Sequence, residues 1–166
     1  MCRYRTHDAV ASLSHVMNRR DFVVFAALTA FIPYAKAGAW ESGSFDNDDA
    51  LDWAGQCVES KGTSLIAATL SAALVDGYLE CSAAVAAAEV VAASQGKASK
   101  SLPKELSSWL KQQQKAEIAK LAPLARKAVS RILNGPQSEL QDLWQENKID
   151  FPVWKSHMQS LIARLK

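Results

Sequence analysis

The residues best suited to chemistry form an acidic stretch in the first half of the chain. Between residues 38 and 60 there are six acidic residues and no basic one. The four that lie closest together are Asp46, Asp48, Asp49 and Asp52. Carboxylate oxygens are the ligands that hard divalent cations prefer, so with Glu80 or Glu89 these residues could hold a metal ion or share acid and base roles. This stretch is therefore the candidate site of a metal-dependent enzyme.

The same acids have a simpler interpretation as the start of a helix. Acidic side chains in the first turn stabilise the positive end of the helix dipole, and Asp46 would cap the helix. An EF-hand is excluded, because Ala50 stands where an oxygen ligand is needed and no glycine follows Asp52. Asp48 and Asp52 would share a helix face, where like charges repel by a few tenths of a kcal/mol, roughly, unless a cation offsets them.

Other catalytic sites are mostly excluded by counting. After residue 37 the chain keeps one histidine, His157, and two cysteines, Cys57 and Cys81. A nucleophilic triad would need His157, which the pattern places at the boundary of an apolar helix face. A zinc site has too few ligands, and no phosphate-binding glycine loop occurs. We therefore expect no catalytic residues and no cofactor, apart from a possible divalent cation. The two cysteines could form a disulfide in an oxidising compartment or remain as two buried thiols.

Positive charge gathers in the second half of the chain. Nine basic residues lie between Lys97 and Arg131, against only two acidic ones. Lys120, Lys127 and Arg131 recur on one face of a predicted helix, which could dock an acidic protein, a lipid headgroup or nucleic acid, or could simply be solvated. From residue 38 onward 14 basic residues face 15 acidic ones, so the domain carries a net charge of −1 and is not expected to bind nucleic acid.

The basic excess of the whole chain comes from its leader. Residues 17–37 resemble an export signal, with paired Arg19 and Arg20, an apolar run over Phe22–Ala35 and a small-x-small site at residues 35–37. The arginine pair is similar to a twin-arginine signal. A run of this length makes a helix of about 21 Å, shorter than the roughly 30 Å of a hydrocarbon core. We therefore expect export to the periplasm or beyond, cleavage after Ala37, and no stable membrane span in the mature form. Residues 1–16 are expected to be a disordered extension or to precede the true start.

Hydrophobic periodicity predicts an all-α bundle of about seven helices over residues 38–166. The expected helices cover 46–60, 63–75, 80–94, 103–110 and 116–133, followed by one that begins after Ser138 and one that begins at Asp150. Pro123 is expected to kink or divide the fifth, and Gly96 to end the third. Ser138 and Gln141 form a capping box. The residues expected to face inward include Leu51, Ala54, Gly55 and Val58 in the first helix, Leu140, Leu143 and Trp144 in the sixth, and Trp154 and Met158 in the last.

The opening of this domain carries a family resemblance. The segments that carry it are Gly38–Trp40, Phe45–Trp53, Asp76–Glu80, Ala88–Ala92, Leu102–Trp109 and Ser138–Trp144. In these segments the chain resembles a bacterial family known as domain of unknown function 4259, whose opening here follows Ala37 directly. The resemblance implies a single domain over residues 38–166 and implies no activity. From the charge segregation we expect a noncatalytic module that binds a protein partner, with a metal-dependent enzyme or a structural domain without a specific ligand as alternatives.

Overall fold

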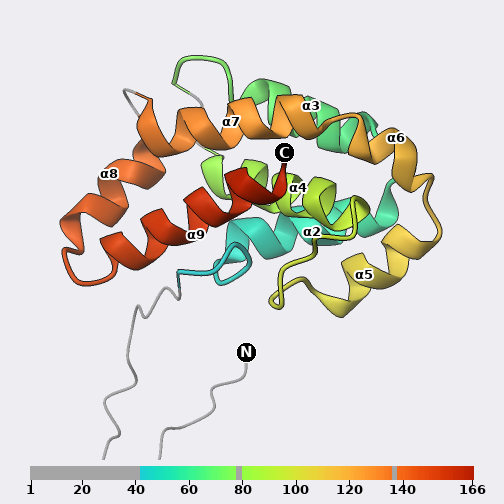
Figure 1. Cartoon of the computed structure of the whole chain (residues 1–166), viewed down its shortest axis with the longest axis horizontal. Helices are drawn as coiled ribbons and strands as arrows, with labels where there is room; N and C mark the ends of the chain where they lie inside the picture. Colours follow the sequence, from blue (N-terminus) through green and yellow to red (C-terminus); the bar gives the residue numbers. More distant parts are fainter. Residues whose placement is uncertain (1–41, 78–79, 136–137) are drawn as a thin grey trace, which may run out of the picture. The chain divides into compact units, whose positions relative to one another are not determined.

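The computed structural model describes residues 42–77, 80–135 and 138–166. Within these ranges the chain forms eight α-helices and no β-strand, which confirms the all-α prediction. The helices are α2 (Asp48–Glu59), α3 (Ser64–Ala72), α4 (Cys81–Ser94), α5 (Lys104–Lys111), α6 (Lys115–Ala119), α7 (Ala122–Asn134), α8 (Glu139–Glu146) and α9 (Phe151–Arg164) (Figure 1). The predicted extension and signal peptide lie outside the described residues. None of the described helices combines the length and the apolar character that crossing a membrane requires.

The alanine-rich helix α4 is the centre of the domain. Thirteen of its 14 residues are buried, and α4 contacts each of the other seven described helices. In Figure 1 it runs through the middle, between α7 and α2. A helix that is apolar on all sides is stable only when it is surrounded, and small alanine side chains let its neighbours approach closely. The composition of this one segment therefore explains why the other helices wrap around it.

Several helix ends follow the local sequence. Gly96 ends α4 with φ 80°, and the amide N–H groups of Gly96 and Lys97 donate to Ala93 and Ala92 in the pattern of a Schellman cap. At the start of α8, Ser138 Oγ accepts a hydrogen bond from the Gln141 amide at 3.3 Å. The predicted end of α4 at Gly96 is confirmed, and of the predicted capping box the structure shows the hydrogen bond that Ser138 accepts.

The cap of α2 differs from the prediction. Asn47, not Asp46, is the N-cap, and its side chain accepts a hydrogen bond from the Ala50 amide at 2.9 Å. Asp46 Oδ2 accepts instead from the Gly43 amide at 2.8 Å, in the turn that precedes the helix. Asparagine and aspartate are equally good caps, so their order in the chain cannot decide between them.

The helix expected over residues 116–133 is divided, which accounts for the eighth helix. α6 ends at Ala119, and α7 begins at Ala122 with Pro123 in its first turn. Proline has no amide hydrogen to donate to a preceding turn but is well tolerated in a first turn, where no such donor is needed. Pro123 therefore starts a new helix instead of kinking one long helix.

The buried face of α2 is not the predicted one. Leu51 and Val58 are 48% and 37% exposed. Gly55 is exposed as well. The residues that enter the core are Ala50, Trp53, Ala54 and Cys57, of which only Ala54 was predicted to face inward. The two sets differ by one position, a rotation of about 100° around the helix, and burial of the large indole of Trp53 favours the observed one. Leu143, which we expected to be buried in α8, is also 46% exposed.

The end of the bundle formed by α8 and α9 is held by aromatic side chains. The rings of Trp144 and Trp154 stack with centroids 6.1 Å apart, and Phe151 stacks on Trp154 at 5.8 Å. Offset stacking at these distances adds to the stabilisation from apolar burial. The expected inward positions of Trp144, Trp154 and Met158 are confirmed, since all three are buried.

Candidate functional site: an acidic groove

Helices α2 and α3 and the start of α4 enclose an open groove with a volume of about 500 Å³. Its lining residues are Asp49, Asp52, Trp53, Gln56, Leu65, Thr69, Glu80 and Ala83. Two of the predicted acids on α2 thus share a surface with Glu80, which directly precedes α4. We call this surface the acidic groove.

A buried hydrogen-bond chain fixes the wall of the acidic groove. The Trp53 indole is 4% exposed, and its Nε1 donates to Thr69 Oγ1 at 2.9 Å. Thr69 Oγ1 in turn donates to the backbone carbonyl of Leu65 at 3.0 Å. The hydroxyl of Thr69 thus uses its one hydrogen within α3 and accepts a hydrogen bond from α2. The exposed polar groups of the groove are its carboxylates and Gln56.

The carboxylates of α2 have no internal counter-ion among the described residues. Asp48, Asp49 and Asp52 are exposed, and none forms an ion pair with a described lysine or arginine. In the part of the chain that the structure describes, no three His, Cys, Asp or Glu side chains are grouped so that they could hold a metal ion. Asp48 does not line the groove, and Asp46 is engaged with Gly43. Only Asp49 and Asp52 of the predicted four therefore face it.

Glu89, the other carboxylate considered for a metal site, has a different environment. It is 2% exposed and accepts two hydrogen bonds from Arg164, at 2.6 and 2.7 Å. Ser44 Oγ donates a third at 2.9 Å. This carboxylate joins the segment before α2, the central helix and the end of α9, and it is not part of the acidic groove.

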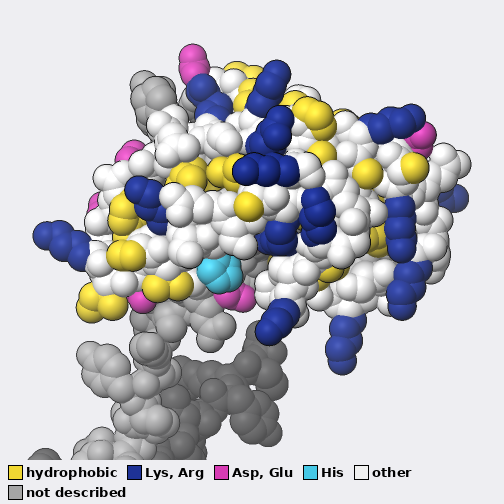
Figure 2. Space-filling view, in the orientation of Figure 1, with side chains coloured by type: hydrophobic (Ala, Val, Ile, Leu, Met, Phe, Trp, Pro, Cys, Tyr) yellow, Lys and Arg dark blue, Asp and Glu magenta, His cyan; other side chains and the backbone are white. Residues whose placement is uncertain are grey.

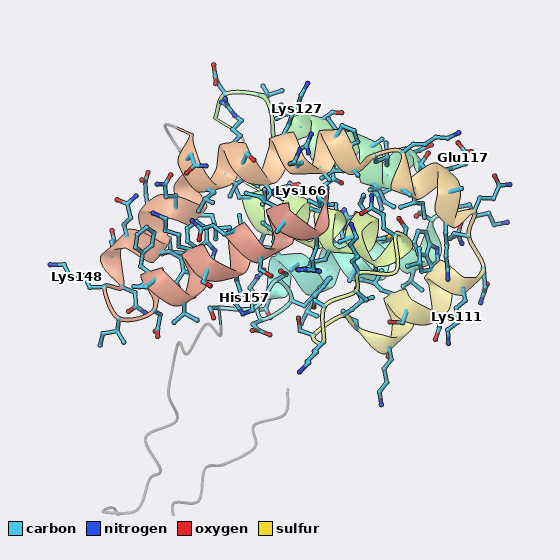
Figure 3. All side chains as sticks on the ribbon, in the orientation of Figure 1. Lys111, Glu117, Lys127, Lys148, His157 and Lys166 are labelled. Atoms are coloured by element: carbon cyan, nitrogen blue, oxygen red, sulfur yellow. The ribbon has the colours of Figure 1, made fainter. Side chains whose placement is uncertain are left out.

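The three predicted basic residues do not form one face of a single helix. Lys120 caps the end of α6, and its Nζ lies 2.7 Å from Glu117 Oε1. Arg131 on α7 pairs with Asp76. Lys127 is exposed on α7 and pairs with no described carboxylate. Internal pairing therefore uses two of the three charges, and Lys127 (Figure 3) has no described counter-ion.

The cysteines and the histidine do not form a catalytic group. Cys57 and Cys81 are both buried and are not joined by a disulfide in the structure. Burial raises the pKa of the Cys57 thiol to about 11, only partly opposed by a hydrogen bond from Ser60. His157 is exposed on α9 beside a hollow of about 20 Å³, and no hydrogen bond joins it to a described residue. A nucleophile needs a base within hydrogen-bond reach, which this arrangement does not supply.

Helix α3 lines the groove, although its residues were not among the predicted site residues. Leu65 and Thr69 belong to a predominantly apolar helix with no charged residue. The one signal in the sequence is Thr69, a polar residue within this apolar helix, because a polar side chain that becomes buried needs a hydrogen-bond partner.

Comparison with known proteins places this domain in a family. No curated protein and no solved structure matches the chain. The family model described as "Domain of unknown function (DUF4259)" matches residues 38–157. The matched region is most of the chain and contains every residue that lines the acidic groove. The chain therefore belongs to the DUF4259 family.

Proposed function

We propose that this chain is an exported, noncatalytic helical module that binds a protein partner through the acidic groove, and that the partner presents a basic segment. The observation that carries this proposal is the meeting of Asp49, Asp52 and Glu80 at one open groove, where no described lysine or arginine pairs with them. Carboxylates without an internal partner are available to an incoming cationic side chain.

The size and lining of the groove suit side chains of a partner. Its volume of about 500 Å³ lies within the range of roughly 300–1,000 Å³ that is usual for ligand sites. Leu65 and Ala83 supply apolar contact area between the charged groups. Arginine is the favoured occupant, because its planar guanidinium binds carboxylates in bidentate fashion and its stem packs on apolar surface.

Export is supported by the leader. Residues 17–37 carry the features of a signal peptide described above. The domain would then meet its partner in the periplasm or outside the cell. Intact mass of the protein recovered from its native host tests this part: cleavage after Ala37 is expected, and full-length chain in the cell interior would contradict it.

The binding site is tested with two variants of matched charge. Asp49→Asn with Asp52→Asn removes the two acids of α2 from the groove, whereas Asp142→Asn with Glu146→Gln removes the same charge from α8, outside it. Each variant and the wild type would be immobilised and exposed to envelope extract, and bound proteins quantified by mass spectrometry. We expect a partner that is retained by the wild type and the α8 variant, with affinity for the groove variant lower by at least roughly tenfold. Equal retention by all three proteins would reject the groove as the binding site.

The metal-dependent enzyme remains a distinct alternative that uses the same acids. It predicts that Ca²⁺, Mg²⁺ or Mn²⁺ binds the wild type in calorimetric titrations and does not bind the groove variant. No heat of binding at millimolar ion would remove this alternative. A structural domain without a specific ligand predicts neither a metal nor a groove-dependent partner.

A further inference from the structure

A second charged surface lies over the helices that follow α4. Between Lys97 and Arg131 nine basic residues meet two acidic ones. The three described ion pairs use Lys120, Arg131 and Arg164 and leave the remaining basic side chains without a described carboxylate. Those that are exposed include Lys100, Lys104, Lys111, Lys115, Arg126, Lys127 and Lys166. The positive charge here exceeds what the described part of the domain neutralises internally.

Three of these lysines come from helices that are distant in sequence and lie on one viewed side of the domain. Figure 3 shows Lys111 at the end of α5, Lys127 on α7 and Lys166 just after α9. In Figure 2 the lysine and arginine side chains spread across this side, with few acidic groups among them. We define the lysine surface as the exposed basic residues Lys100, Lys104, Lys111, Lys115, Arg126, Lys127 and Lys166. Only the tertiary fold assembles it.

The lysine surface lacks the features of a protein interface. Stable protein interfaces have a desolvated, largely apolar centre surrounded by polar groups. The exposed large hydrophobic residues in the described part of the domain are Leu51, Val58, Val75, Leu143, Ile149 and Val153. None of them belongs to α5, α6 or α7. Hydrophobic side chains appear among the basic ones on this side in Figure 2, but they are scattered, so a partner would not find one large apolar centre.

The surface also lacks the features of a single-stranded nucleic-acid site. Such sites stack bases on exposed aromatic rings between basic residues. The described Trp residues are buried, and none lies among the exposed large hydrophobics. The charge is mainly lysine, a hydrated point charge without the bidentate fork by which arginine recognises individual groups. Diffuse charge of this kind fits a target with many mobile negative groups.

We propose that the lysine surface docks the domain on a bilayer that contains anionic phospholipids. Exposed lysines near such a bilayer are attracted by its negative surface potential, and the attraction extends over about one Debye length. The same potential repels Asp49, Asp52 and Glu80, so the charge asymmetry turns the acidic groove toward water. Docking would thus concentrate the domain at a membrane while its groove remains available.

Vesicle binding by the full chain tests this proposal. Partition onto phosphatidylglycerol–phosphatidylcholine vesicles is measured by cosedimentation, with pure phosphatidylcholine vesicles as reference. The test variant combines Lys111→Ala, Lys127→Ala and Lys166→Ala. Its matched control combines Lys61→Ala, Lys148→Ala and Lys155→Ala, which removes the same charge from outside α5, α7 and the chain end. The leader is common to all proteins, so a difference in partition coefficient between two of them reports on the substituted lysines.

We expect the test variant to lose roughly fivefold in partition coefficient per lysine, or about a hundredfold in all, and the control to stay near the wild type. Binding should disappear at 1 M salt, where the Debye length falls to about 3 Å. The groove variant should bind vesicles at least as well as the wild type, so failure of this proposal is distinguishable from failure of the proposed function. Three outcomes would overturn it: no preference for anionic vesicles, equal losses in test variant and control, or tighter lysine-dependent binding to duplex DNA than to vesicles.

Discussion

Replacing Arg164 by methionine would remove the main partner of a buried carboxylate. Glu89 on α4 is 2% exposed, and Arg164 donates hydrogen bonds to both of its oxygens. In the variant, the hydroxyl of Ser44 would remain as the one described donor to this carboxylate. Methionine preserves most of the apolar stem of arginine, so the change acts chiefly on charge.

The structure sets the expected size of the effect. Removing one member of a buried ion pair costs about 3–5 kcal/mol, because the remaining charge is uncompensated. The side chain of Arg164 is 23% exposed, so water can reach the pair and partly solvate the carboxylate. We therefore expect the Arg164→Met variant to lose about 3 kcal/mol of unfolding free energy, at the lower end of that range.

A double-mutant cycle separates the ion pair from the loss of packing. Glu89→Gln leaves Arg164 with its hydrogen bond to the Lys97 carbonyl, at 3.0 Å, and should cost about 1–2 kcal/mol. The double variant contains no buried charge and should be less destabilised than the sum of the single variants, with a coupling energy of about 2 kcal/mol.

Urea unfolding followed by tryptophan fluorescence measures these changes, because the indoles of the described domain are buried. Lys155→Met serves as control, since it removes an exposed charge from the same helix and should change stability by less than about 0.5 kcal/mol. A loss below about 1 kcal/mol in Arg164→Met, or a coupling energy near zero, would show that Arg164 does not compensate the charge of Glu89.

Three further perturbations test other parts of the structure. Trp53→Phe removes the donor to Thr69 and should lower the unfolding free energy by about 1 kcal/mol beyond the loss of packing, as seen in urea titrations; an unchanged midpoint would contradict the buried hydrogen bond. Ala87→Leu, at a position with no exposed surface on α4, should cost about 1–3 kcal/mol or prevent folding, whereas Ala163→Leu on the exposed side of α9 should change the melting temperature little. The raised pKa of Cys57, about 11, predicts slow alkylation of the native thiol at pH 8 compared with the unfolded chain. Because the unfolded thiol ionises first, the unfolding free energy should fall as the pH rises from about 9 to about 11, and this fall should be smaller in Cys57→Ala.

Local sequence predicted the helices well because their ends are set by short-range chemistry. A glycine that can adopt positive φ ends α4, a serine hydroxyl caps α8, and a proline begins α7. The division at Pro123 was one of two predicted outcomes. The helix divides, and does not kink, because proline is tolerated in a first turn but removes a hydrogen bond from a helix interior. Each of these features depends on residues within a few positions of each other, so the sequence alone is enough to predict these helix ends.

The acidic site was only partly predictable. The sequence indicated that Asp49 and Asp52 share a helix and named Glu80 as a possible companion. It did not indicate which face of α2 is buried, since the sets beginning at Ala50 and Leu51 are both apolar enough to form a core. It also could not show that α3 closes the groove through Thr69, because that contact depends on how two helices pack.

The residue pattern along this chain thus determined an all-helical domain, the place of most of its helix ends and the separation of acidic from basic segments. Tertiary packing alone decided which of those charged side chains are paired within the domain. It joined Glu89 to Arg164 across 75 positions of sequence, paired Lys120 and Arg131 internally, and left Asp49, Asp52 and Lys127 available. The physical reason is that periodicity and capping act within a turn or two of helix, whereas the partner of a charged side chain depends on how distant helices pack around α4.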